Sequence, residues 1–469
     1  MINRLSPEML SRARSAYFIG IGGAGMSAIA KLLHERGIRV FGSDLKESRT
    51  TQQLQAAGIP VFIGQKESKI SPDSDLIVYS SAIAKDHLEM KMANQMNKTV
   101  FHRAEVLSAI VNDAATSIAV AGTHGKTTTA SMIAFVLHDL GKRPTCLIGG
   151  EVIDFGTNAL IGSNQLCVSE VDESDQTHEL FYPNYSVITN LEEEHVDHYK
   201  AENELNDSFR RFLAHMHHPG LCVYFEDDVR LRGLVLESSV PKLSFGFSAS
   251  ANVSARNVQL STQGVAFDVF EYGLYATRVN MGLLGLHNVL NALACFGLLS
   301  QLGIEPEQIA DSLSRFHGAK RRLEIKFRND SLVVVNDYAH NPTKVKASVQ
   351  ALKVYRKPLT VIFQPHRYTR TQRFYKDFAQ ALRDADQVIV TDIYSASEIN
   401  TTGIHSNAIV EELRVLDHPK VLFMPKHQIL AHLEEEKSEG VIAFLGAGDI
   451  GEIANEFSDR FKDVASVKR

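Results

Sequence analysis

One short stretch of this chain combines glycines, a lysine and threonines at spacings that suit phosphate chemistry. Residues 121–129 read Ala-Gly-Thr-His-Gly-Lys-Thr-Thr-Thr, between an apolar run at Ser117–Val120 and a helical pattern at Ala130–Leu140. Glycines let backbone N–H groups surround a phosphate, and the positive end of a following helix attracts the same anion. Lys126 adds a charge for the β- and γ-phosphates, and the Thr127 hydroxyl suits Mg²⁺. The stretch predicts an ATP site in a shortened loop, because Val120 stands where the usual spacing has a glycine.

Two acidic segments follow apolar strand patterns downstream of this loop. Glu170–Asp175 follows Leu166–Ser169, and a segment that contains His195 follows Ser186–Asn190. Ligands bind at the carboxyl ends of parallel strands, and crowded carboxylates require cations. A solvated acidic loop is the alternative for Glu170–Asp175, and we expect His195 to be a metal or phosphate ligand.

A second glycine-rich turn lies near the start of the sequence. Gly20, Gly22 and Gly25 follow the strand pattern Ala16–Gly20 in a G-x-G-x-x-G spacing, and Asp44 ends the next strand. This is the dinucleotide fingerprint, in which the acidic side chain faces a ribose. Three interpretations are open: a nicotinamide cofactor, another diphosphate-linked nucleotide, or a turn without a ligand. The ATP loop favours the second, because a dehydrogenase does not need one.

Two further polar segments each have a structural and a functional interpretation. His287–Ala292 begins a helix, where amides are commonly caps but could also contact a nucleotide. Gly318–Glu324 is a basic turn that is either solvated or closes on the ATP phosphates, since arginine binds phosphate through two parallel hydrogen bonds.

Two loops in the last third of the chain carry histidines and arginines directly after strand patterns. Asn336–Pro342 follows Leu332–Val335, and Gln364–Thr371 follows Leu359–Phe363. Arginines at such a position suit a substrate carboxylate. Either His340 or His366 could accept a proton there.

Alternating strands and helices predict an α/β protein in three blocks. The expected domains are 1–109, with a Rossmann-like doubly wound sheet; 110–317, a P-loop ATPase-like domain; and 318–469, a second Rossmann-like domain. Residues 241–282 look like short antiparallel strands.

Composition restricts the class of protein. The 469 residues are 44% hydrophobic and 22% charged, with a net charge of −6, which argues against a general nucleic-acid or membrane surface. The four cysteines, Cys146, Cys167, Cys222 and Cys295, have no metal-ligand spacing and indicate buried thiols in a reducing compartment. Without a signal-peptide core or a membrane-length apolar run, we expect a cytoplasmic monomer or homodimer.

Six ordered motifs together resemble the Mur ligases of peptidoglycan synthesis over nearly the whole chain. They are Gly20–Ser27, Gly122–Thr129, Asp172–Asp175, His287-Asn288, Asp337–His340 and His366–Arg370. Within the family, the chain is most similar to the branch that joins L-alanine to UDP-N-acetylmuramate, and next to the branch that recycles murein tripeptide. One departure is Tyr338-Ala339-His340-Asn341-Pro342, where the L-alanine branch usually reads Tyr-Gly-His-His-Pro.

The resemblance implies a reaction and the residues that perform it. ATP would phosphorylate the lactyl carboxylate of UDP-N-acetylmuramate, and L-alanine would attack the acyl phosphate. The implied ATP contacts are Gly122, Thr123, His124, Gly125, Lys126, Thr127, Thr128, His287, Asn288, Asn291, Arg322 (or its neighbour Arg321) and Asp337. The implied UDP-sugar contacts are Gly20, Gly22, Gly23, Ala24, Gly25, Met26, Ser27, Asp44, Ser80 and Ser81. Substrate carboxylates would meet Tyr338, His340, His366, Arg367 and Arg370. Mg²⁺ would bind Thr127, Glu170 and His195, and the catalytic group would be Lys126, Glu170, His195, Arg322 and His340.

Overall fold

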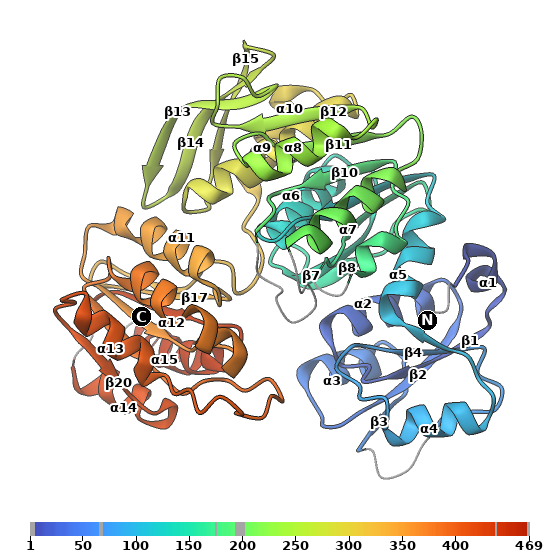
Figure 1. Ribbon diagram of the computed structural model, residues 1–469, viewed down its shortest axis with the longest axis horizontal. Coiled ribbons are helices and arrows are strands. Elements are labelled where there is room, and N and C mark those ends of the chain that lie inside the picture. Colours follow the sequence, from blue (N-terminus) through green and yellow to red (C-terminus); the bar gives the residue numbers. More distant parts are fainter. Residues whose placement is uncertain (1–4, 65–68, 174–175, 193–201, 437–438, 467–469) are drawn as a thin grey trace. The chain divides into compact units, whose positions relative to one another are not determined.

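The structure is a computed structural model that describes residues 5–64, 69–173, 176–192, 202–436 and 439–466. Two compact units divide the chain. The first comprises Met1–Arg256, Asp268–Val279 and Leu290–Phe316, and the second comprises Asn257–Phe267, Asn280–Val289 and His317–Arg469. Within the described residues, the strands form three sheets of five, ten and six strands, interspersed with helices (Figure 1). The predicted α/β class is confirmed.

The first sheet has the strand order β3-β2-β1-β4-β5, and its neighbouring strands are all parallel. This order places a switch point beside β1, where Rossmann-like folds bind ligands. Its elements are α1 (Pro7–Arg12), β1 (Ser15–Ile19), α2 (Ala24–Glu35), β2 (Arg39–Asp44), α3 (Arg49–Ala56), β3 (Val61–Ile63), β4 (Leu76–Tyr79), α4 (Leu88–Gln95), β5 (Val100–His102) and α5 (Arg103–Asn112).

The second sheet has the order β15-β14-β13-β12-β11-β10-β6-β9-β7-β8. Strand β6 lies between β9 and β10, so loops after these three strands meet at one edge. The elements up to β11 are β6 (Thr116–Ala121), α6 (Lys126–Asp139), β7 (Thr145–Val152), β8 (Thr157–Leu160), β9 (Leu166–Glu170), η1 (Thr177–Leu180), β10 (Tyr185–Ile188), α7 (Glu202–Ala214) and β11 (Leu221–Phe225). The remaining elements are α8 (Val229–Glu237), β12 (Lys242–Gly246), β13 (Val253–Ser261), β14 (Gly264–Glu271), β15 (Leu274–Met281), α9 (Leu286–Gln301) and α10 (Pro306–Arg315).

The third sheet has the order β16-β17-β21-β18-β19-β20, in which β16 is antiparallel to β17 and the other pairs are parallel. Its strand ends bring the loops after β17, β18 and β21 together. Its elements are β16 (Glu324–Arg328), β17 (Leu332–Asp337), α11 (Pro342–Leu352), η2 (Lys353–Tyr355), β18 (Leu359–Phe363), α12 (Tyr368–Leu382), β19 (Gln387–Val390), α13 (Asn407–Val415), β20 (Val421–Phe423), α14 (Lys426–Glu435), β21 (Gly440–Leu445) and α15 (Ile450–Ser466).

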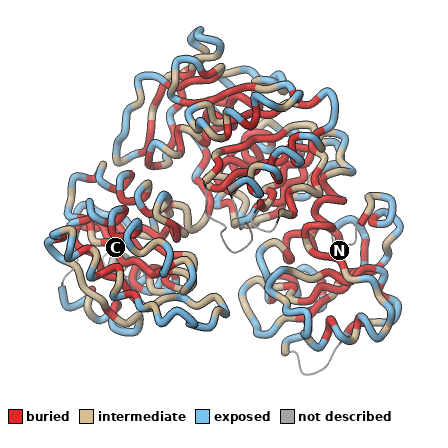
Figure 2. The backbone as a smooth tube through the Cα atoms, in the orientation of Figure 1, coloured by how far each residue is buried: buried red, intermediate tan, exposed pale blue. Residues whose placement is uncertain are grey.

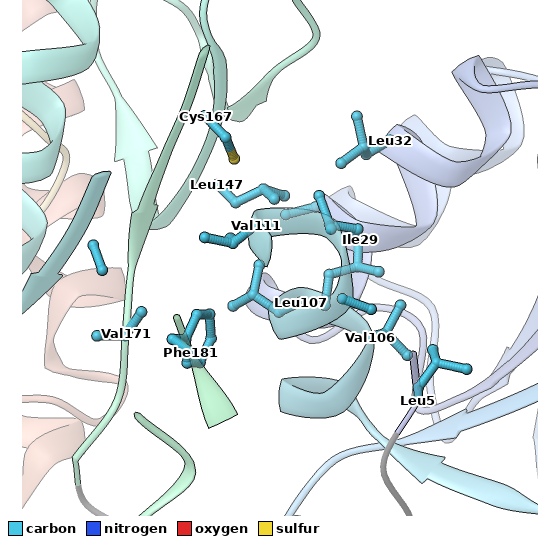
Figure 3. Packing of buried hydrophobic residues seen from close by; sticks show 14 of the residues in the cluster. Leu5, Ile29, Leu32, Val106, Leu107, Val111, Leu147, Cys167, Val171 and Phe181 are labelled. Carbon is cyan, nitrogen blue, oxygen red and sulfur yellow. The ribbon is translucent and has the colours of Figure 1, made fainter. Parts of the chain in front are cut away.

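The inner strands β1, β6, β17 and β21 are buried along nearly their whole length, as strands covered on both faces must be (Figure 2). Strands β3, β13, β15 and β16 also carry exposed residues. In β17 the side chains alternate between two cores, with Val333 and Val335 in one and Leu332 and Val334 in the other. A third core joins helices α2 and α5 to the second sheet. Figure 3 shows members of this core: Ile29, Leu32, Val106, Leu107, Val111, Leu147 and Cys167.

Two local expectations were wrong. Helix α6 begins at Lys126 rather than Ala130, because Gly125 takes a left-handed conformation (φ 82°) that ends the loop, and the helix starts at the next residue. Residues 241–282 are not antiparallel throughout, since β12 pairs in parallel with β13. Among the described residues, no helix combines the length and apolar composition needed to cross a membrane.

Candidate active site

The loop between β6 and α6 requires glycine at two positions. Gly122 has φ 114° and Gly125 has φ 82°, a region that side chains with a Cβ rarely adopt. A Cβ on Gly122 would also lie 2.5 Å from Thr189 Oγ1, and one on Gly125 would lie 2.5 Å from Asn291 Oδ1. The loop therefore passes tightly against its neighbours and leads directly into the N-terminus of α6, where backbone N–H groups face outward for an anion.

Residues after β10 hold the shape of this loop. Thr123 N donates to Asn190 O (3.1 Å), and His124 N donates to Asn190 Oδ1 (2.8 Å). Glu192 N donates to Thr123 Oγ1 (2.9 Å), and a Glu192 carboxylate oxygen lies 3.1 Å from His124 Nε2. The loop conformation is thus fixed by the fold before any phosphate arrives.

Lys126 lies in a strongly acidic environment. Its Nζ donates to both oxygens of Glu173 (2.9 and 2.8 Å) and to Gly122 O (2.6 Å), and Glu173 is fully buried. Burial alone would lower the pKa of Lys126, but the carboxylates of Glu173, Asp172 and Glu170 outweigh it and raise the pKa above its usual value. Lys126 is therefore cationic at neutral pH.

The two predicted metal ligands that the structure describes lie side by side. Thr127 Oγ1 donates to Glu170 Oε2 at 2.9 Å, and Gly149 N donates to the same oxygen at 2.9 Å. A hydroxyl and a carboxylate are hard oxygen donors of the kind Mg²⁺ prefers. The third predicted ligand, His195, lies outside the described residues. Within the ranges that the structure describes, no three His, Cys, Asp or Glu side chains form a ready metal site.

Helix α9 carries the predicted residues His287, Asn288 and Asn291. Asn291 Oδ1 accepts a hydrogen bond from Thr129 Oγ1 (3.2 Å), which places this amide against the start of α6. Asn288 Nδ2 donates to Leu284 O (2.8 Å), a contact within the helix start. Burial lowers the pKa of His287 to about 4, so its imidazole is neutral at pH 7.

The first glycine loop is held by the end of β2. Gly20 N and Ile21 N both donate to Ser43 O (2.9 Å each), and Gly22 N donates to Asp44 Oδ2 (2.8 Å). Helix α2 then begins after Gly23 without a side-chain cap, which leaves its first N–H groups available to an anion.

The other predicted UDP-sugar residues differ in what their side chains contact. Met26 is buried in the core and Ser27 Oγ donates to Ala24 O (3.0 Å), so neither side chain projects from the loop. Ser81 Oγ lies 3.0 Å from His102 Nε2, and the carbonyl of Ser80 accepts from Ile83 N (2.9 Å).

Asp337 ends β17 in a buried position. Burial raises the pKa of its carboxyl group, while a hydrogen bond from Ser348 and the charge of Arg322 act in the opposite direction. The guanidinium of Arg322 lies over the Tyr338 ring, 5.0 Å from its centroid. Arg321 lies over the same ring at 4.9 Å, and its Nη2 donates to the carbonyls of Gly446 and Gly448 (2.9 Å each).

The histidines and arginines of the third sheet converge, as their positions after β17 and β18 predict. The rings of His340 and His366 lie 5.8 Å apart, and Arg370 Nη1 lies 3.3 Å from His366 Nδ1. Arg367 extends toward Glu398, with 3.8 Å between Nη1 and Oε1. Asn341 caps α11 by accepting from Lys344 N (2.8 Å), which gives this departure from the usual motif a structural role.

Family models match nearly the whole chain. The Mur ligase family catalytic domain matches residues 15–114, the Mur ligase middle domain matches 120–299, and the Mur ligase glutamate ligase domain matches 321–448. The chain belongs to the Mur ligase family.

Several relatives of this Mur ligase share its full length. A UDP-N-acetylmuramate–L-alanine ligase of Carboxydothermus hydrogenoformans is 37% identical over 441 residues, which cover 94% of this chain and 95% of the relative. The protein of the same name from Aquifex aeolicus is 39% identical over 449 residues, 95% and 97% of the two chains. A crystal structure of UDP-N-acetylmuramate–alanine ligase from Thermotoga maritima aligns with a TM-score of 0.81 and 30% identity, covering 96% of this chain and 99% of the other.

Three groups of contacts in this Mur ligase are not among those predicted from the sequence. Glu173 was recognised only as part of an acidic segment, and nothing in its spacing marks it as the partner of Lys126. The loop Gly446–Gly448, which accepts hydrogen bonds from Arg321, follows a strand pattern at 441–445 and could have been found by that signal. Arg103 Nη2 lies 3.3 Å from Asp172 Oδ2, and a Cβ on Gly25 would meet Arg103 Nη1 at 3.3 Å.

Proposed function

We propose that this Mur ligase joins L-alanine to the lactyl carboxylate of UDP-N-acetylmuramate and releases ADP and phosphate from ATP. Full-length relatives that carry the name UDP-N-acetylmuramate–L-alanine ligase, at 37–39% identity, support this substrate pair. The observation in the structure that carries the proposal is the ATP loop. Lys126 and Thr127 form the first turn of α6, and the Thr127 hydroxyl donates to Glu170 at the end of β9.

ATP binds at this loop in the proposed enzyme. The backbone N–H groups of Gly122–Thr128 and the Lys126 ammonium hold the phosphates, and Asn291 supports the loop from α9. His287, Asn288, Arg322 and Asp337 are the remaining proposed nucleotide contacts. Thr127 and Glu170 would hold Mg²⁺, with His195 as a further ligand, and the metal when bound would neutralise phosphate charge.

The UDP-sugar lies on the first glycine loop. Its diphosphate meets the uncapped N-terminus of α2 after Gly20–Gly25. Asp44 accepts from Gly22 N and so shapes the loop, and in the proposed complex it also contacts the ribose. Ser80 and Ser81 complete the proposed contacts.

The amino acid and the substrate carboxylates meet the loops of the third sheet. Arg370 and Arg367 supply positive charge for the carboxylates. The same substrate site is lined by the side chains of Tyr338, His340 and His366, which contact one another or Arg370. The lactyl carboxylate oxygen attacks the γ-phosphorus of ATP, and ADP leaves. The amine then attacks the acyl phosphate, and phosphate leaves as the amide forms. Positioning and charge stabilisation can together supply on the order of 10 kcal/mol of the barrier reduction.

Phosphate release by the purified protein tests the proposal. We expect release from ATP and Mg²⁺ only when UDP-N-acetylmuramate and an acceptor are both present, and fastest with L-alanine among L-alanine, L-serine, glycine and murein tripeptide. Release only with the tripeptide would move the chain to the recycling branch. No release with any acceptor would overturn the proposed activity.

A further inference from the structure

A buried carboxyl group lies close to the first glycine loop, outside the residues assigned above to substrate. Glu89, in the first turn of α4, is 1% exposed. Its Oε2 accepts from Ser43 Oγ (2.5 Å), and its Oε1 accepts from the phenol of Tyr17. Both hydroxyl residues are buried and belong to the neighbouring strands β2 and β1. Because a buried carboxyl group needs hydrogen bonds in place of its lost water, these two hydroxyls hold the Glu89 side chain.

The chemistry of the three groups sets the direction of both hydrogen bonds. Burial and the contact with Glu89 raise the pKa of Tyr17, so its phenol keeps its proton at neutral pH and can donate. The Ser43 hydroxyl donates to the other oxygen. Both oxygens of Glu89 therefore act as acceptors, as they do in an ionised carboxylate. Glu89 thereby connects β1 and β2 through side chains on one face of the first sheet.

Ser43 connects this carboxylate to the glycine loop. Its carbonyl oxygen accepts from Gly20 N and Ile21 N (2.9 Å each), while its side chain is held by Glu89. The next residue of β2, Asp44, accepts from Gly22 N (2.8 Å). Side chains of successive strand residues point to opposite faces, so Ser43 can reach Glu89 while Asp44 reaches the loop. The end of β2 thus holds three N–H groups of the loop, and Glu89 holds the end of β2.

We propose that Glu89 is a positioning residue for the UDP-sugar, because through Ser43 it holds the first glycine loop in the conformation that receives the diphosphate. This assignment rests on the function proposed above. Glu89 is buried and does not touch the substrate, so it acts only through the loop. A loop that is already held in its bound conformation loses less entropy when the ligand binds. The affinity for the UDP-sugar therefore depends on the contact between Glu89 and Ser43.

Two single substitutions separate positioning of the loop from stability of the fold. Ser43→Ala removes the hydroxyl that connects Glu89 to the loop. Tyr17→Phe is the matched control, because it removes the other hydroxyl from the same carboxylate and keeps the ring that packs against Phe41 (5.4 Å between centroids). Each variant loses one hydrogen bond to a charged group, so we expect both to lower the Tm by roughly 3–6 °C.

Binding affinity distinguishes the two variants. The dissociation constants for UDP-N-acetylmuramate and for ATP with Mg²⁺ are measured separately by isothermal titration calorimetry. We expect Ser43→Ala to raise the Kd for UDP-N-acetylmuramate by about 5- to 10-fold, and Tyr17→Phe to leave it within about 2-fold of wild type. The Kd for ATP should stay within about 2-fold in both variants, because the ATP loop follows β6 of the second sheet.

A double-mutant cycle tests whether Glu89 acts through Ser43. Glu89→Gln keeps the shape of the side chain and can still bond to both hydroxyls, but these bonds are weaker without the charge of the carboxylate. We expect Glu89→Gln alone to raise the Kd for UDP-N-acetylmuramate by about 3-fold. Added to Ser43→Ala, it should cause no further rise, because the connection to the loop is already broken.

Each outcome decides for or against the assignment. An unchanged Kd in Ser43→Ala, an equal rise in Ser43→Ala and Tyr17→Phe, or independent effects of Glu89→Gln and Ser43→Ala would overturn it. If Ser43→Ala does not fold, Glu89→Gln decides alone, and a wild-type Kd in that variant overturns the assignment. If the wild-type protein binds ATP but not UDP-N-acetylmuramate, the proposed function itself is wrong. That result differs from a failure of Glu89 alone, in which the wild type and all variants bind the UDP-sugar equally.

Discussion

The buried pair between Lys126 and Glu173 gives a quantitative test of the ATP loop. Glu173→Gln keeps the shape of the side chain but removes its charge, and the Lys126 ammonium then loses the partner that contacts it at 2.8 and 2.9 Å. Breaking a buried pair on one side typically costs about 3–5 kcal/mol. Asp172 and Glu170 also raise the pKa of Lys126, so in the variant they still balance part of its positive charge. We therefore expect the free energy of unfolding to fall by about 2–3 kcal/mol.

Thermal melting without nucleotide measures this loss. A unit of this size shifts its Tm by about 2 °C per kcal/mol, so the Glu173→Gln transition should fall by roughly 4–6 °C. Glu192→Gln is the matched control, since Glu192 contacts His124 in the same loop but its side chain is 43% exposed. An exposed pair contributes about 0–1 kcal/mol, so the control should melt within about 2 °C of wild type.

The same melting measurement is then repeated with saturating Mg²⁺ and ATP. The triphosphate supplies new negative charge to Lys126, so the Tm difference between Glu173→Gln and wild type should narrow. If Glu173→Gln melts like wild type without nucleotide, the pair does not stabilise the loop as argued. If the difference does not narrow with ATP, Lys126 does not contact the phosphates.

Three further predictions concern the ATP loop and Glu105, a buried residue of helix α5. Lys126→Ala should lower phosphate release by about 10²-fold or more, as measured in steady-state kinetics, and wild-type activity would remove Lys126 from the site. Gly125→Ala should destabilise the protein by at least about 1–2 kcal/mol and raise the KM for ATP, because its φ is 82° and its Cβ would lie 2.5 Å from Asn291 Oδ1. Glu105→Gln should stabilise the protein at pH 8 by up to about 3 kcal/mol, since burial raises the pKa of Glu105 to about 7. The folded protein resists ionisation of Glu105, so this gain should vanish as the pH falls to about 4.5, and a pH-independent Tm difference would contradict it.

The sequence predicted the parts of the site that depend on local pattern. A strand followed by a glycine turn and a helix has few possible geometries, so the loops at Gly20 and Gly122 were found from spacing alone. Positions at strand ends also placed His340 near His366, because carboxyl ends of parallel strands share one edge.

Contacts between segments far apart in the chain could not be predicted in this way. Glu173 meets Lys126, and Arg321 meets the carbonyl of Gly446, only after the sheets have assembled. The start of α6 was also misplaced, because Thr127–Thr129 are poor helix formers and tertiary context outweighs that preference.

Transfer of ¹⁸O from the sugar substrate to phosphate tests most directly the central claim that the reaction passes through an acyl phosphate. UDP-N-acetylmuramate labelled with ¹⁸O in its lactyl carboxylate is turned over with ATP, Mg²⁺ and L-alanine, and the phosphate released is analysed by mass spectrometry. The account predicts that one carboxylate oxygen appears in each phosphate, together with the L-alanine amide in the sugar product. Phosphate without the label, or label in a nucleotide, would contradict the acyl-phosphate route and the ligase activity that depends on it.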